Sequence, residues 1–120
     1  MHELSIAQSI LETVREHVPS EDLRYVSQVK LRVGSLSGVV PESLDFSFRA
    51  ITAETPLKET QLEIQRMPFI VQCSVCSQTS SNDVGIVLCE SCGSSNVHIV
   101  SGLELDVAEI EMNKPVEEEI

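Results

Sequence analysis

Residues 73–92 read CSVCSQTSSNDVGIVLCESC and contain all four cysteines of the chain. Two residues separate Cys73 from Cys76, two separate Cys89 from Cys92, and twelve lie between the two pairs. This spacing lets both sulfurs of a pair reach one ion from a tight turn, and two such turns complete a tetrahedron of thiolates. Gly93 follows the second pair, where a close backbone turn favours a residue without a side chain. The pattern predicts that Cys73, Cys76, Cys89 and Cys92 hold one structural zinc ion.

Other uses of paired cysteines fit this sequence less well. Disulfides belong mainly to secreted proteins, and no secretory signal is seen, because the chain starts Met1-His2-Glu3-Leu4 without a basic region followed by an apolar run. A redox-active C-x-x-C usually accompanies a βαβ unit, which the sequence pattern lacks. Four cysteines also bind iron, and spacing alone does not choose between the metals.

Composition and charge limit the functions that the chain can have. Its 120 residues include 19 acidic and 8 basic side chains, for a formal net charge of -11. Nucleic-acid binding is not expected, because it rests on neutralising phosphates with Lys and Arg. Divalent cations and basic partner surfaces would be attracted instead. No apolar run approaches the roughly 18 residues of a membrane span, so we expect a cytoplasmic protein.

Two amphipathic helices are predicted before the cysteines. The first has an apolar stripe at helical spacing, formed by Leu4, Ala7, Leu11, Val14 and Val18. Pro19 ends it, because the residue before a proline is pushed out of helical conformation. The second begins at Pro41, a residue well suited to the first position of a helix, and its stripe comprises Leu44, Phe48 and Ile51.

Three strands are predicted from alternating apolar and polar residues. Their apolar positions are Val29, Leu31 and Val33 in the first, Leu62 and Ile64 in the second, and Leu103, Leu105 and Val107 in the third. This order predicts an α+β fold, with two helices packed on a three-stranded sheet and an inserted zinc-ribbon module. The predicted domains are residues 1–68 plus 102–112, the module at residues 69–101, and an acidic tail at residues 113–120. The edges of so small a sheet would allow a homodimer.

The N-terminus offers a second kind of metal site. The Met1 amine, the deprotonated backbone amide of His2 and the His2 imidazole can chelate one ion through adjoining rings, with the Glu3 amide as a fourth nitrogen. A planar set of nitrogen donors suits Ni(II) or Cu(II) far better than Mg, Ca or Zn. A histidine at position 2, taken alone, is more often not a metal ligand.

The remaining histidines and motifs add no catalytic site. His17 lies near the end of the first helix, where a cation favours the helix dipole, and is expected to be structural or solvent-facing. His98 lies in a strand-like run, and its alternative reading is an outer-shell or secondary nickel contact. No nucleophile-and-base motif appears, and a zinc ion bound by four cysteines has no open coordination position. The sequence therefore predicts a protein that is not an enzyme.

Several segments together resemble the HypA/HybF family of hydrogenase maturation factors. They are the start Met1-His2-Glu3-Leu4-Ser5, the turn Val33-Gly34-Ser35-Leu36-Ser37-Gly38-Val39, the helix start Pro41-Glu42-Ser43-Leu44, the two cysteine pairs, and the closing Leu103-Glu104-Leu105-Asp106-Val107. The resemblance runs from residue 1 to about residue 112. The combination is specific, although no single segment is.

The resemblance implies a nickel chaperone for [NiFe]-hydrogenase assembly that works with a HypB-type GTPase and the hydrogenase large subunit. By position, His2 would bind nickel with Glu3 and the Met1 amine beside it, and the four cysteines would bind zinc. The main rival reading is a zinc-ribbon adaptor that binds another protein and never handles nickel. A thiol redox protein is a weaker second rival.

Overall fold

The computed structural model describes residues 3–113. They form two compact units. Unit 1 contains residues 3–31, 40–64 and 107–113, and unit 2 contains residues 32–39 and 65–106. The predicted domain boundaries at residues 68 and 101 stay a prediction. The predicted α+β class is confirmed, with two helices, a three-stranded sheet and a cluster of four cysteines.

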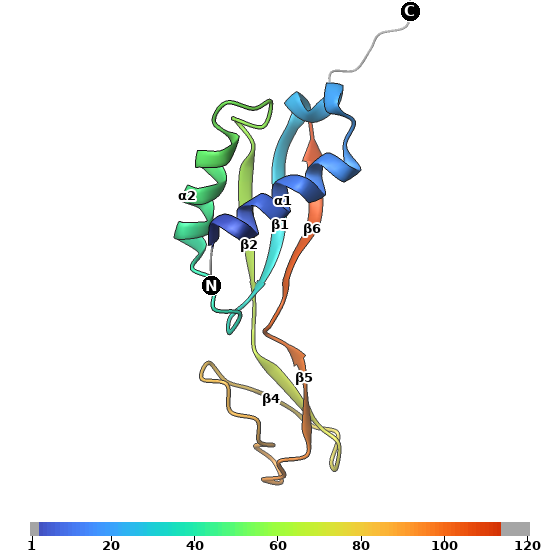
Figure 1. Cartoon of the computed structure of the whole chain (residues 1–120). Helices are drawn as coiled ribbons and strands as arrows, with labels where there is room; N and C mark the ends of the chain where they lie inside the picture. Colours follow the sequence, from blue (N-terminus) through green and yellow to red (C-terminus); the bar gives the residue numbers. More distant parts are fainter. Residues whose placement is uncertain (1–2, 114–120) are drawn as a thin grey trace, which may run out of the picture. The chain divides into compact units, whose positions relative to one another are not determined.

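Helix α1 (Glu3–His17) and helix α2 (Pro41–Thr52) pack against each other in unit 1 (Figure 1). Both begin and end within a few residues of the predicted positions. The buried side chains of α1 are Ala7, Ile10, Leu11 and Val14. The prediction was wrong for Leu4, which is 49% exposed, because the buried face starts one turn into the helix.

Strand β1 (Val26–Gly34) is the centre of the first sheet, which has the order β2-β1-β6. β2 spans Gln61–Met67 and β6 spans Leu105–Met112. Val29, Leu31 and Val33 are buried, as their alternation predicted. β6 starts two residues later than predicted, and Leu103 lies exposed before it rather than inside the sheet. A 3-10 helix (Ser20–Tyr25) follows Pro19 and was not predicted.

The polar side chains of the first sheet include a charge cluster in unit 1. The Lys30 Nζ atom of β1 lies 3.1 Å from a Glu109 carboxylate oxygen, 3.5 Å from Glu111 and 3.8 Å from Glu63. The hydrogen bond to Glu109 and the nearby carboxylates raise the pKa of Lys30. Because these groups are largely exposed, water and salt screen the ion pairs. The cluster keeps an acidic excess, which fits poorly with a nucleic-acid surface.

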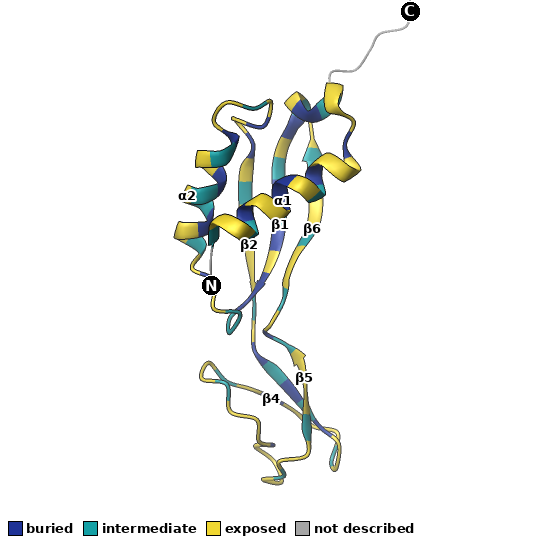
Figure 2. Ribbon diagram, in the orientation of Figure 1, coloured by how far each residue is buried: buried dark blue, intermediate teal, exposed yellow. Residues whose placement is uncertain are grey.

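The second sheet has the order β4-β3-β5 and is antiparallel (Figure 1). β3 spans Ile70–Cys73, β4 Thr79–Ser81 and β5 Val97–Ser101. Only a few side chains of these strands are buried, and Figure 2 shows much of unit 2 as exposed. Within residues 3–113 no helix has the length and apolar character that a membrane span requires.

Two glycines allow a close backbone crossing inside unit 2. The Gly34 N–H donates to the Glu104 carbonyl at 2.8 Å, and the Leu36 N–H donates to the Gly102 carbonyl at 3.0 Å. A Cβ atom on Gly34 would lie 2.1 Å from the Gly102 carbonyl carbon. Gly102 has a φ of 119°, and a Cβ atom there would lie 2.6 Å from the Phe69 Cα atom. Neither position therefore has room for a side chain.

The turn after β5 is held by the Glu104 carboxylate. It accepts hydrogen bonds from the Gly102 N–H at 2.6 Å and from the Ser101 hydroxyl at 2.9 Å. Burial raises the pKa of the Glu104 carboxyl, but these donors outweigh it and the net pKa lies below the usual range. The turn thus keeps Gly102 in the conformation that the crossing requires.

We predict that Gly34→Ala destabilises the protein by about 3 kcal/mol or more, because the new methyl group meets backbone atoms that cannot rotate away. Gly38→Ala is the control, because Gly38 has a φ of 82° but nothing within 4 Å of a Cβ atom. Gly38→Ala should lower the free energy of unfolding by only about 1–2 kcal/mol, the cost of a side chain in the left-handed region. Urea unfolding followed by circular dichroism measures both values. Equal values for the two variants would contradict a steric origin of the glycine requirement at the crossing.

Candidate metal centre

The first pair of cysteines lies on a tight turn at the end of β3. The Cys73 N–H donates to the Gln78 carbonyl at 2.9 Å, and the Ser77 N–H donates to the Cys73 carbonyl at 3.0 Å. The N–H groups of Val75 and Cys76 point at the Cys73 sulfur, at 3.3 Å and 3.4 Å. Backbone donors aimed at a sulfur favour its thiolate form.

The second pair repeats this turn. The Cys89 N–H donates to the Ser94 carbonyl at 2.9 Å, and the Gly93 N–H donates to the Cys89 carbonyl at 2.9 Å. Gly93 has a φ of 74°, and Ser77 holds the same place in the first turn with a φ of 64°. The two turns are thus equivalent in hydrogen bonding and in backbone conformation. Ser77 was missed from the sequence, although aligning Cys-x-x-Cys-Ser with Cys-x-x-Cys-Gly would have revealed it.

A buried serine ties the second turn to the sheet. The Ser80 hydroxyl of β4 accepts the Glu90 N–H at 3.0 Å, and Ser80 is only 5% exposed. The second pair belongs to no strand, so this bond is one of the contacts that position it beside the first pair. The sequence held no local signal for this contact, because it joins residues ten apart through a loop.

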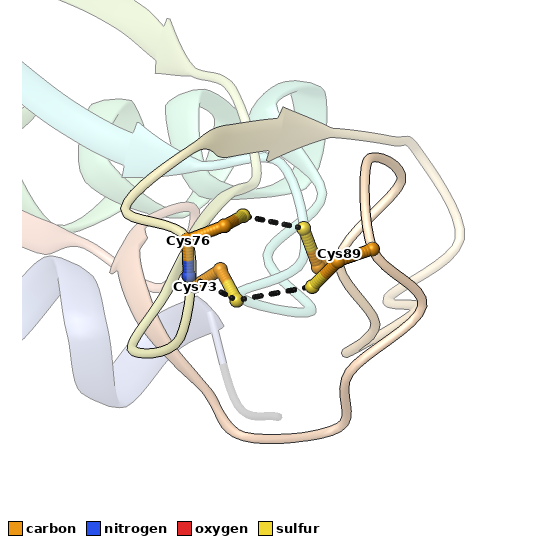
Figure 3. Close-up of side chains that lie close together, drawn as sticks. Cys73, Cys76 and Cys89 are labelled. Carbon is orange, nitrogen blue, oxygen red and sulfur yellow. Dashed lines mark hydrogen bonds between the residues drawn. The ribbon is translucent and has the colours of Figure 1, made fainter.

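The four sulfur atoms converge on one point (Figure 3). The Cys76 and Cys89 sulfurs lie 3.5 Å apart, the Cys73 and Cys92 sulfurs lie 3.7 Å apart, and all four lie within 4.8 Å of one another. A tetrahedral ion with bonds of about 2.3 Å to sulfur needs sulfur–sulfur separations of about 3.8 Å. The donor set and its spacing therefore fit a tetrahedral, thiolate-bound ion.

The four cysteine thiols can all be deprotonated together only when a cation lies between them. Cys73 and Cys89 are buried, and the pKa of the Cys89 thiol is lowered to about 6 by the Cys92 N–H and the neighbouring donors. The Gln78 N–H lowers the pKa of Cys76, but the Cys89 sulfur and burial outweigh it and raise that pKa to about 12. Crowded sulfurs thus resist simultaneous deprotonation. A bound divalent ion allows all four to be thiolates.

Of the three predicted nickel ligands, only Glu3 lies among the residues that the structure describes. Met1 and His2 lie outside the described residues, and Glu3 is the half-buried first residue of α1. His17 is exposed, and its Nδ1 atom lies 2.8 Å from the Thr13 carbonyl oxygen, in line with a structural or solvent-facing role. His98 is exposed on β5 opposite Gln72. Among residues 3–113, the four cysteines form the only group of three or more His, Cys, Asp or Glu side chains close enough to hold an ion.

Comparison with known proteins shows which family the chain belongs to. A family model described as "Hydrogenase/urease nickel incorporation, metallochaperone, hypA" matches residues 1–112. The chain belongs to the HypA family. Its members are maturation factors and not enzymes, as the sequence predicted. The family assignment, together with the four-cysteine cluster, makes this chain a metal-binding member of a nickel metallochaperone family.

Individual relatives agree with this assignment. The chain is 40% identical over 120 residues to hydrogenase maturation factor HypA of Desulfatibacillum aliphaticivorans, covering 98% of this chain and 91% of that protein. It is 37% identical over 115 residues to the HypA of Desulfosudis oleivorans, covering 95% of this chain and all of that protein. The solution structure of the Ni metallochaperone HypA from Helicobacter pylori superposes with a TM-score of 0.66 at 26% identity, covering 93% of this chain and 97% of that one.

We predict that Ser77→Gly stabilises the metal-loaded protein by about 1 kcal/mol, because a side chain in the left-handed region is unfavourable and glycine is not. Gly93→Ala is the matched control in the equivalent turn and should destabilise by a similar amount. Thermal unfolding of the metal-loaded variants measures both. If Ser77→Gly destabilised the protein, the serine side chain would have to support the first turn, and the equivalence of the two turns would be wrong.

Proposed function

We propose that the chain binds Ni(II) at its N-terminus and delivers it for the maturation of [NiFe]-hydrogenase. The observation that carries the proposal is the family match over residues 1–112, which includes the start of the chain as well as the four cysteines. The Helicobacter pylori relative is described as a Ni metallochaperone. The ligands we assign to nickel are the Met1 amine, the amide and imidazole of His2, and Glu3.

The chemistry of this end of the chain supports the assignment. Nitrogen donors linked through adjoining rings favour a planar arrangement, which suits Ni(II). Glu3 is the first residue of α1. The first N–H groups of a helix have no carbonyl partner inside the helix. The Glu3 amide is therefore available to a metal without the loss of a helical hydrogen bond.

For the cysteine cluster we propose zinc in a structural role. Four thiolates close the coordination sphere of a tetrahedral ion, so no position stays open for water or for a transferable ligand. Such a closed site suits permanent retention. A terminal site of nitrogen donors suits loading and release. We keep residues 69–101 as the zinc-ribbon module, residues 1–68 plus 102–112 as the nickel-binding domain, and residues 113–120 as the acidic tail.

The proposed partners are a HypB-type GTPase and the hydrogenase large subunit, with a homodimer as a further state. The family's place in hydrogenase maturation supports contact with that machinery. We place the protein in the cytoplasm, where hydrogenase precursors and the GTPase would be met. The family description also names urease incorporation.

We predict that His2→Ala lowers the affinity for Ni(II) by more than about 100-fold, because loss of an outer-shell group alone already costs 10–100-fold. Calorimetric titration of untagged, zinc-loaded protein with its native Met1 measures the effect. His17→Ala and His98→Ala are matched controls and should bind nickel as the parent chain does. Acetylation of the Met1 amine removes this nitrogen as a donor and should also weaken binding strongly.

The zinc-ribbon adaptor is the alternative that this titration rejects or supports. Equal, weak nickel binding by the parent chain and by His2→Ala would exclude the N-terminal site. It would leave a protein whose metal is structural and whose task is to bind another protein.

A further inference from the structure

The loop between the two cysteine pairs exposes a cluster of large apolar side chains. Val84 is 74% exposed, and Ile86, Val87 and Leu88 are each exposed by about half. Figure 2 shows most of the segment between β4 and the second cysteine pair as exposed. Single exposed apolar residues are common on proteins, but a contiguous group marks an interaction surface. We call residues 84–88 the apolar loop.

Hydrogen bonds from the Asn82 side chain brace the start of the apolar loop. The Asn82 carboxamide oxygen accepts the Val84 N–H at 3.0 Å and the Ile86 N–H at 2.9 Å, and its nitrogen donates to the Ile86 carbonyl at 2.9 Å. Gly85 has a φ of 80°, which few other residues adopt readily. A surface that is ordered before binding loses less conformational entropy when it binds. The function proposed above does not use the loop.

Charge around the loop selects the kind of partner. No Lys or Arg occurs between Arg66 and Lys114. The acidic residues next to the loop are Asp83 and Glu90, and of the two arginines in unit 2, Arg32 is paired with Asp106. Four thiolates around a divalent ion would add two further negative charges. A second copy of a chain with net charge -11 would bring like charge to the contact, whereas a surface with basic residues would be attracted.

We propose that the apolar loop docks into an apolar depression on a partner protein whose rim carries Lys and Arg side chains. The proposal deepens the function proposed above, on which it rests, because the partner would be a protein that exchanges nickel with this chain. The apolar side chains would supply the buried contact, and the acidic surroundings would orient the approach. In this arrangement the zinc site fixes the two ends of the loop, and unit 1 carries the nickel.

The test uses the full-length, zinc-loaded chain carrying the two substitutions Val84→Ser and Ile86→Ser. The probes are the purified GTPase and the purified immature large subunit, each titrated alone. Loss of apolar contacts at the centre of an interface should raise the dissociation constant of at least one complex by about tenfold or more. Phe46→Ser is the matched control, because Phe46 is 75% exposed on α2 and lies in the other unit. It should leave both affinities unchanged.

Added salt provides a second readout, because screening weakens contact between an acidic surface and a basic rim. The association rate of the affected complex should fall as ionic strength rises. Unchanged affinity for both partners in the loop variant would overturn the proposal, and so would an equal loss in Phe46→Ser. A loop variant that changes only the self-association of the chain in sedimentation would assign the loop to a second copy instead.

Two measurements on the loop variant separate this proposal from the one on which it rests. Its zinc content and its nickel affinity should equal those of the parent chain, because the loop contains no metal ligand. If His2→Ala leaves nickel binding intact while the loop variant loses partner binding, the nickel site is wrong and the docking surface stands. If His2→Ala abolishes nickel binding and the loop variant binds both partners normally, the docking surface is wrong.

Discussion

The convergence of four cysteine sulfurs on one point is the constraint on which unit 2 depends. Among the described residues of its two ribbon turns and second sheet, few large apolar side chains are buried beyond Phe69 and Val71. Conformational entropy would exceed what so small a core can offset. We infer that metal–thiolate bonds supply the missing free energy, because ligands that meet only in the folded state couple binding to folding. Every surface that unit 2 presents, the apolar loop included, would then rest on the bound ion.

Unit 1 has the opposite character, because its stability comes from the burial of apolar side chains between two helices and a sheet. Val14, Leu44 and Phe48 are fully buried there and need no metal. This difference matches the two tasks that we assign to the chain. A closed thiolate site retains its ion, whereas an open site of nitrogen donors at the chain's end permits release. In this proposal the two properties lie in different parts of the chain.

The sequence predicted the features that local patterns control. Helical spacing located α1 and α2 to within a few residues, and cysteine spacing indicated that four sulfurs would meet. It failed where neighbours distant in the chain decide the structure. The exposure of Leu4, the late start of β6 and the close crossing of Gly34 with Gly102 depend on such neighbours. Of the second sheet, the strand-like run around His98 was recognised and became β5, whereas β3 and β4 were missed because they are only four and three residues long.

The central claim is that zinc and nickel occupy separate sites with different ligands. X-ray absorption at both metal edges tests this claim most directly, on protein loaded with zinc and one equivalent of nickel. We expect four sulfur ligands at about 2.3 Å around zinc and only nitrogen or oxygen ligands around nickel. Sulfur in the nickel coordination shell, or nitrogen replacing sulfur at zinc, would contradict the separation of the two sites. Either result would mean that the four cysteines are not a closed zinc site separate from the nickel site.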